Sequence, residues 1–310
     1  MSTKQKISLE YLITSQMNPT STIPLNSAEI RNYIYYGFKS DKLRPKYWKI
    51  LLGYHPKNKF KSDSFYIVYR KSYHTIKIPD NERIKTLKDQ LYKDIARTEV
   101  FNEKYNCYKE PIRNILLKYI ATNQCLGYIQ GMINLVIPLY HVLYTSEDLD
   151  DKKYAEEDTF YLFHNLMAEM THPVTEILSP TSDIITEKVQ EVYKIVKEKD
   201  PKFYTMLESK EVLEMAFPIK WIIQMFTSLY EMDDVVYIWD KLLSDSYHFE
   251  LLNYCCAAFI LLKKKTLKDT NFYNFVEVFK TSSDVPVKEL FDIADKLRRS
   301  NKSFDVIMKK

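Results

Sequence analysis

Apolar residues recur at intervals of three and four along much of this chain, and this spacing constrains the fold more than any other feature. Because an α-helix has about 3.6 residues per turn, the spacing places these side chains on one helix face. The clearest stripes are Ile84, Leu87, Leu91 and Ile95; Ile112, Ile115, Leu116, Tyr119 and Ile120; Ile129, Met132, Ile133, Val136 and Ile137; Ile185, Val189, Val192, Tyr193 and Val196; and Val287, Leu290, Phe291, Ala294 and Leu297. No convincing run of alternating residues predicts a strand, so the expected class is all-α.

Glycine is scarce, and its four positions are Gly37, Gly53, Gly127 and Gly131. Phosphate loops, G-x-G-x-x-G dinucleotide turns and G-x-S-x-G nucleophile elbows need glycine spacings that these positions do not provide. The usual glycine-rich nucleotide sites are therefore excluded. Since glycine serves where the backbone takes a positive φ or a neighbour comes close, the four positions mark special backbone geometry.

The predicted organisation is an N-terminal arm, a large helical domain and a short tail. Residues 1–26 lack sustained periodicity and are expected to be mostly irregular. The acidic stretch 146–154 is interpreted as a junction between two lobes, with a surface loop as the alternative. The resulting boundaries are 1–26 for the arm, 27–300 for the domain, 27–150 and 151–300 for its lobes, and 301–310 for the tail.

Composition and charge are those of an ordinary globular protein. Of the 310 residues, 45% are hydrophobic and 28% are charged, and the net charge of +4 comes from 45 basic and 41 acidic residues scattered together. A chain of this length buries about three quarters of its unfolded surface. No charge excess predicts nucleic-acid binding, and the histidines show no metal-ligand spacing.

No segment predicts a signal peptide or a membrane span. The N-terminus is polar, and the longest apolar runs, such as Tyr254–Leu262, are too short for a bilayer. Ser2 stands where myristoylation requires glycine, and the C-terminal Met308–Lys310 is no prenylation box. The protein is expected to be cytoplasmic and to meet membranes only indirectly, through a partner.

Two further patterns have plain structural interpretations. The four cysteines lack C-x-x-C spacing and are interpreted as reduced thiols of the core; they are Cys107, Cys125, Cys255 and Cys256. The basic run Lys263–Lys265 is interpreted as the end of a helix, where cations suit the helix dipole. A phospholipid-binding surface is the less favoured interpretation of that run.

Two short segments carry residues suited to chemistry. Asp94 and Arg97 lie within Leu91–Thr98, and Gln130 lies within Gly127–Met132. In phosphoryl transfer, an arginine neutralises charge on the transferring group and a glutamine positions the attacking water. Taken alone, Arg97 is explained as an ion pair with Asp94 worth about 0.2–0.5 kcal/mol, and an exposed glutamine near a helix start is unremarkable.

Together the two segments resemble the signatures of the TBC domain of Rab GTPase-activating proteins, which read roughly I-x-x-D-x-x-R and Y-x-Q-G. Arg44-Pro45, Trp48 and Leu51–Gly53 are similar to the family's R-P-x-x-W-x-x-L-L-G element. Lys220-Trp221 and Trp239-Asp240 resemble its late R-W and W-D positions. The resemblance runs from about residue 27 to about residue 300 and looks closest to the short members that are little more than the domain. It implies a two-lobed, all-helical TBC domain.

The resemblance also implies roles for individual residues. Arg97 is then the arginine delivered in trans to the γ-phosphate of a Rab-bound GTP, and Gln130 replaces the GTPase's own glutamine in aligning water. Asp94 orients Arg97, and Tyr128 braces the glutamine loop or meets the partner. The remaining assignments are Gly131 and Thr98 as supporting or partner-binding residues, and Arg44, Trp48, Trp221, Trp239 and Asp240 as structural ones.

The implied function is activation of a GTP-bound Rab-family small GTPase, which would regulate vesicle trafficking at endomembranes. No independent nucleotide hydrolysis and no cofactor are expected, since GTP and Mg²⁺ belong to the partner. Departures from the family pattern are Leu91, Glu99-Val100, Ile133 and Lys220. They leave open a weak or inactive module that holds a Rab or an adaptor, and helical periodicity alone permits an unrelated scaffold. The particular Rab, the compartment and the oligomeric state stay open.

Overall fold

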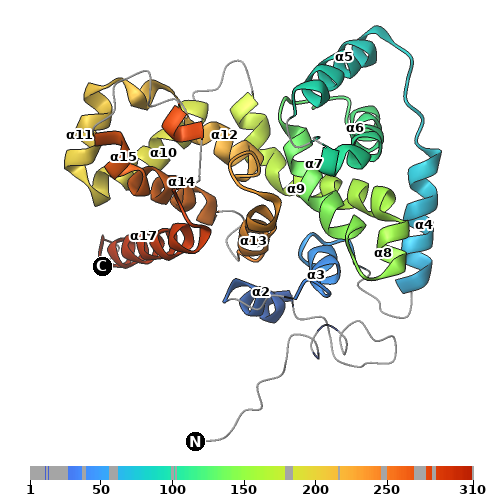
Figure 1. Ribbon diagram of the computed structural model, residues 1–310, viewed down its shortest axis with the longest axis horizontal. Coiled ribbons are helices and arrows are strands. Elements are labelled where there is room, and N and C mark those ends of the chain that lie inside the picture. Colours follow the sequence, from blue (N-terminus) through green and yellow to red (C-terminus); the bar gives the residue numbers. More distant parts are fainter. Residues whose placement is uncertain are drawn as a thin grey trace, which may run out of the picture. The chain divides into compact units, whose positions relative to one another are not determined.

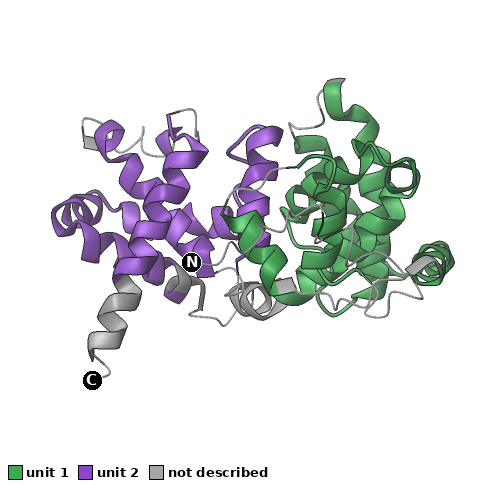
Figure 2. Cartoon of the chain, turned by 90° about the horizontal axis from the view of Figure 1, so that it is seen from below, with its two compact units in different colours: residues 1–170 green, residues 171–310 purple. Residues whose placement is uncertain are grey.

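The computed structural model describes residues 11, 13, 27–36, 40–55, 62–98, 101, 103–178, 184–215, 217–245, 250–268, 277–280 and 284–308. These residues are mostly helical and include no β-strand, so the all-α prediction is confirmed. The chain forms two compact units, Met1–Met170 and Thr171–Lys310 (Figure 2). Most of the predicted arm, together with Gly37, Glu99 and Val100, lies outside the described residues.

Unit 1 is built from helices (Figure 1). In chain order they are α2 (Ser27–Tyr35), α3 (Arg44–Leu51), α4 (Ser62–Thr75), α5 (Glu82–Arg97), the 3₁₀ helix η3 (Glu103–Tyr108), α6 (Lys109–Thr122), α7 (Met132–Tyr144), α8 (Leu149–Lys153) and α9 (Ala155–Leu178), which continues past Met170.

The predicted apolar stripes form the core of unit 1. On α5, Ile84, Leu91 and Ile95 are buried, and every residue of the predicted α6 stripe is buried. The side chain of Asn81 begins α5 by accepting a hydrogen bond from the Ile84 backbone N–H at 2.9 Å. The third stripe differs from the prediction at one position, because α7 begins at Met132 and Ile129 lies in the loop before it.

The acidic stretch proposed as a lobe junction lies inside unit 1. It forms α8 and leads into α9, and the division between the units comes later, after Met170. Asp151 and Asp158 are buried because Lys49 Nζ donates to both, at 2.6 and 2.8 Å. The acidic run is solvated along most of its length, and Lys49 compensates the one carboxylate of it that is buried, Asp151.

Unit 2 surrounds an apolar helix. Its elements are α10 (Ile184–Lys199), α11 (Pro201–Ser209), the 3₁₀ helix η4 (Val212–Met215), α12 (Phe217–Gln224), α13 (Met232–Leu243), α14 (Glu250–Leu262), α15 (Lys264–Lys268) and α17 (Val287–Met308). Helix α14 packs against α10, α12 and α17, and most of its residues are buried, as expected for a helix that is apolar on all sides. Helix α17 continues through most of the segment predicted as a tail.

The cysteine interpretation needs correction at two positions, and the lysine run has a feature that the sequence did not predict. Cys255 and Cys256 are buried in α14 as predicted, but Cys107 and Cys125 are exposed. Lys263 follows the end of α14 as interpreted, but it is 1% exposed and forms an ion pair with Asp284. The chain turns directly from α14 into α15 at this residue, which carries the side chain inward. Among the described residues, no helix has both the length and the apolar character needed to cross a bilayer.

Candidate functional site

Arg97 is the last residue of α5, and its side chain is exposed. It forms no hydrogen bond or ion pair with any residue that the structure describes, so the surface pair with Asp94 considered from the sequence is absent. The predicted position, outward from the apolar stripe of α5, is the one observed. A guanidinium in this state is free to meet a second molecule.

Asp94, one turn earlier, is occupied elsewhere. Its Oδ2 accepts hydrogen bonds from the Tyr128 hydroxyl and from the backbone N–H of Gly131, the latter at 3.0 Å. These two donors lie on either side of Gln130. Asp94 therefore ties the glutamine loop to the last turn of α5, where the sequence had suggested that it orients Arg97 directly.

The Tyr128 side chain is buried and holds this loop in place through its hydrogen bond to Asp94. Burial raises the pKa of its hydroxyl, and the hydrogen bond and negative charge of Asp94 raise the pKa further. The phenol therefore stays protonated and remains a donor to the carboxylate throughout the physiological range. Gln130 itself is exposed and has no hydrogen bond to a described residue.

The glycines flanking the loop allow its path. Gly127 has a φ of 68°, and a Cβ on it would lie 3.2 Å from Leu87 Cδ1 of α5. Gly131 has a φ of 97° and is the N-cap of α7. Both backbone conformations are left-handed, which glycine adopts at no steric cost. They let the loop return to α5 and start α7 directly after Gln130.

Thr98 closes the helix that carries Arg97. Its hydroxyl donates to the Asp94 carbonyl oxygen at 2.7 Å, and its backbone N–H donates to the Ile95 carbonyl oxygen at 3.3 Å. These bonds satisfy carbonyls that a helix C-terminus leaves free. The backbone at Arg97 is thus held while its side chain is not.

The residues assigned structural roles from the sequence are buried. Trp48 is in the core of unit 1, and Arg44 forms an ion pair with Asp41. In unit 2, Trp221 packs edge-on against Phe259 with ring centroids 4.9 Å apart. Trp239 is fully buried and its indole N–H donates to Thr227 Oγ1 at 3.2 Å; Asp240 is buried beside it in α13.

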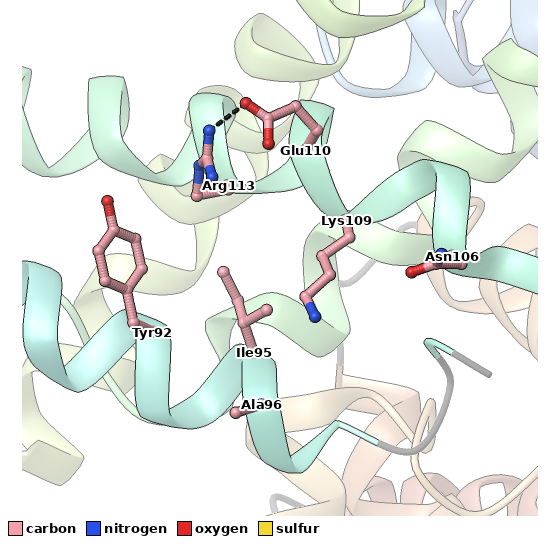
Figure 3. A pocket seen from close by; sticks show the side chains of 7 residues that line it. All are labelled: Tyr92, Ile95, Ala96, Asn106, Lys109, Glu110 and Arg113. Carbon is pink, nitrogen blue, oxygen red and sulfur yellow. Dashed lines mark hydrogen bonds and ion pairs between the residues drawn. The ribbon is translucent and has the colours of Figure 1, made fainter. Parts of the chain in front are cut away.

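An open pocket of about 490 Å³ flanks the last turns of α5, and the sequence did not predict it (Figure 3). Helix α5 contributes one wall, and η3 with α6 contribute the other. The lining residues are Tyr92, Ile95 and Ala96 on α5 and Asn106, Lys109, Glu110 and Arg113 opposite. Arg113 forms an ion pair with Glu110.

Sequence reasoning also missed a buried polar cluster formed by α3, α4 and α9. Arg70 donates to Asp158 through Nε at 2.8 Å and through Nη2 at 2.7 Å, and the Tyr54 hydroxyl donates to the same carboxylate at 3.0 Å. Burial alone raises the pKa of Asp158, but the bonds from Arg70 and the charge of Lys49 outweigh it and lower the pKa. No sequence signal pairs these residues, because Arg70 and Asp158 are far apart in the chain.

The chemistry available at the α5 terminus is that of positioning and charge. An exposed guanidinium follows a fixed backbone, and a carboxylate joins that helix to a loop with an exposed amide side chain. The planar guanidinium of arginine forms bidentate hydrogen bonds with phosphate oxygens, and it stays charged at any physiological pH. The arrangement fits recognition of a phosphoryl group carried by another molecule.

The sequence is similar to proteins that contain a TBC domain. Residues 41–268 match the Rab-GTPase-TBC domain. The chain is 31% identical over 201 residues to TBC1 domain family member 13 of Mus musculus, covering 64% of this chain and 49% of that protein. It is 24% identical over 243 residues to the GTPase-activating protein GYP1 of Saccharomyces cerevisiae, covering 72% and 38%. The chain thus spans about half or less of these relatives' lengths.

The fold has a counterpart among solved structures. The crystal structure of the Ypt/Rab-GAP domain of Gyp1p is similar with a TM-score of 0.80 and 20% sequence identity, covering 96% of this chain and 99% of that one. At this identity the likeness concerns the fold. The all-helical TBC architecture expected from the sequence is therefore confirmed.

Proposed function

The chain belongs to the Rab-GTPase-TBC domain family, and from this premise we propose that it accelerates GTP hydrolysis by a GTP-bound Rab-family GTPase. In this proposal Arg97 contacts the γ-phosphate and Gln130 aligns the attacking water. The observation that carries it is the exposed Arg97 side chain, which has no partner among the described residues, on a helix whose last turn is tied to the glutamine loop.

The arginine supplies charge where the reaction develops it. During phosphoryl transfer, negative charge spreads over the equatorial oxygens of the γ-phosphoryl group, and positioned cations stabilise it. An arginine supplied in trans raises the rate by about 10³ to 10⁵ in Ras-type GTPases, which corresponds to roughly 4 to 7 kcal/mol. A surface ion pair stabilises a protein by far less than this lowering of the activation free energy. Arg97 therefore contributes more by contacting the γ-phosphate than it would by pairing with Asp94.

The Asp94 bonds supply preorganisation. Because Tyr128 and Gly131, on either side of Gln130, are held on α5, the loop loses little conformational entropy when the partner binds. GTP and Mg²⁺ arrive with the GTPase, so the chain needs no cofactor of its own. Through that partner, the chain would act from the cytoplasm at endomembranes and regulate vesicle trafficking.

The test is single-turnover hydrolysis across a panel of GTP-loaded Rabs, with the chain titrated to saturation. For a responding Rab, we expect Arg97→Ala and Arg97→Lys each to lose about 10³-fold or more of the maximal rate, since lysine lacks the planar fork. Gln130→Ala should also lower the maximal rate. Lys85→Ala, which removes an exposed cation from the same helix about 18 Å before Arg97, is the matched control and should stay near wild type.

Two outcomes would contradict the proposal. An Arg97→Ala variant as active as wild type would show that the arginine is not the catalytic group. Tight binding of a GTP-loaded Rab without any acceleration by wild type would make the chain a holding module. Thermal unfolding should be nearly unchanged in Arg97→Ala, because no hydrogen bond or ion pair with a described residue is lost.

A further inference from the structure

Arg97 lies between two different surfaces of α5. With about 3.6 residues per turn, Asp94 and Ala96 lie on opposite flanks of the helix and Arg97 lies on the exposed arc between them. The Asp94 flank holds the glutamine loop. The Ala96 flank lines the pocket (Figure 3). The pocket is thus the neighbour of the proposed catalytic site on the side away from Gln130.

A partner that reaches Arg97 must also cover this pocket. Ala96 is the residue before Arg97. The backbone of Tyr92 is only roughly 7.5 Å from that of Arg97 along the helix axis, at about 1.5 Å per residue. A specific protein complex buries about 800 Å² on each side, which is a patch of roughly 16 Å radius if circular. An interface of this size centred on Arg97 includes the α5 side of the pocket.

The α5 wall of the pocket is apolar. Ile95 forms its buried base, Ala96 is small, and the Tyr92 ring is 45% exposed. An exposed aromatic ring beside a cavity gains from being covered by an apolar side chain, because both surfaces lose their contact with water. A volume of about 490 Å³ accommodates such a side chain with its flanking backbone.

The α6 wall is positively charged. Lys109 is exposed, forms no hydrogen bond or ion pair with a described residue, and reaches from α6 toward Ile95 and Ala96 (Figure 3). Glu110 balances only Arg113, whose Nε is buried without a hydrogen-bond partner. The lining therefore has one cation that its own carboxylate does not compensate. A ligand that matches both walls of the pocket carries an acidic group next to an apolar group.

We infer that this pocket receives an apolar side chain and a neighbouring carboxylate from the surface of the GTPase, and that the contact determines how tightly the partner binds. The inference rests on the proposed function. Lys109 pairs with the carboxylate, and Tyr92 and Ala96 pack on the apolar side chain. The pocket contributes to affinity and selection, whereas Arg97 contributes to the rate of the bound complex.

The experiment uses the full chain and a responding GTP-loaded Rab in single-turnover titrations. Lys109→Glu reverses the pocket charge, and Ala96→Trp fills the pocket from an exposed position. Each should raise the half-saturating concentration about tenfold or more and leave the maximal rate within about twofold. Lys85→Glu, the same charge reversal at an exposed position about 18 Å before Arg97 along α5 and outside the lining, should change the half-saturating concentration by less than about threefold. Arg97→Ala should show the opposite pattern, a lower maximal rate with similar half-saturation.

A rescue identifies the occupant. Acidic surface residues of the responding GTPase are changed one at a time to lysine, and one of them should restore binding to Lys109→Glu by about tenfold while weakening binding to wild type. Restoration by charge exchange requires that the two side chains meet. Lack of rescue by every acidic position would overturn the inference.

The other outcomes separate the inference from the proposed function. If wild type accelerates hydrolysis and both pocket variants keep its half-saturating concentration, the inference fails and the function stands. If Ala96→Trp instead changes the sedimentation of the chain alone, the pocket binds a second copy and the inference fails. If no GTPase responds to wild type, both fail.

Discussion

At the scale of single residues, several donors compete for the carboxylate of Asp94. Asp94 and Arg97 are three apart on α5, a spacing that permits a surface ion pair. The carboxylate instead serves the Tyr128 hydroxyl and the Gly131 N–H. A buried donor left unsatisfied costs about 1–3 kcal/mol, whereas an exposed guanidinium is well hydrated without a partner. The carboxylate therefore bonds to the partly buried donors, and Arg97 has no hydrogen bond or ion pair with a residue that the structure describes.

The glycine that starts the loop allows a sharp stability test. Gly127→Ala should destabilise by about 1–2 kcal/mol for its left-handed backbone, and by more because the new Cβ meets Leu87 at 3.2 Å. Gly53→Ala is the matched control: its φ is also left-handed, at 67°, but the nearest atom is 3.9 Å away. Urea unfolding should rank Gly127→Ala as the more damaging change.

The Leu87 contact is isolated by a double-mutant cycle. Leu87→Ala should reduce the cost of Gly127→Ala and leave the cost of Gly53→Ala unchanged, because only the first pair is in contact. Equal costs for the two glycine changes, or no coupling to Leu87, would contradict the close approach of the loop to α5.

Among the elements, α4 shows why a helix can escape sequence analysis. Its exposed residues include Ile67, Val68 and Tyr69, while Arg70 and Tyr73 are buried. The helix is attached through polar bonds, Arg70 to Asp158 and the Tyr73 hydroxyl to Glu156 Oε1 at 2.6 Å, and through aromatic contacts such as Tyr69 with Tyr161. Its apolar residues do not mark the buried face. A search for apolar periodicity therefore has little to detect.

The cluster around Asp158 predicts a pH dependence of stability. Because its pKa is lower in the folded protein than the unfolded value of about 3.9, its stabilisation is present above pH about 4 and is lost as pH falls through the folded-state pKa. Asp158→Asn should cost about 3–5 kcal/mol near pH 7, since Arg70 and Lys49 keep buried charges. The difference from wild type should shrink below pH about 4.

Urea unfolding followed by circular dichroism between pH 7 and pH 2 measures this difference. Asp89→Asn, an exposed carboxylate on α5, is the control and should follow wild type at every pH. A difference between Asp158→Asn and wild type that does not change with pH would contradict the assignment of the lowered pKa to this residue.

For the whole molecule, the scarcity of glycine predicts that the chain binds no nucleotide by itself. Backbone N–H groups cradle phosphates where glycines let the chain wrap around them, and the four glycines here are not spaced for that. A fluorescent GTP analogue with Mg²⁺ should give no saturable signal with the isolated chain. The same titration of a nucleotide-free Rab is the positive control, and saturable binding by the chain alone would contradict the prediction.

The departures from the family pattern look different once burial is known. Ile133 is fully buried in α7 and faces the core, so this change affects packing rather than the surface offered to a partner. Glu99 and Val100 lie outside the described residues. Of the structural residues, Trp48, Trp221 and Trp239 are buried as expected. The weak-module alternative therefore gains nothing from Ile133.

The sequence by itself determined the helical class, the apolar stripes of α5, α6, α10 and α17, the family, and the residues proposed for catalysis. These depend on spacing along one helix or on short motifs, so they are local in the chain. The tertiary structure alone decided that Asp94 bonds to the glutamine loop, that Asp151 of the acidic stretch is buried against Lys49, that Lys263 is inside unit 2, and that a pocket adjoins the last turn of α5. Each joins residues distant in sequence, and burial made their pairing energetically necessary.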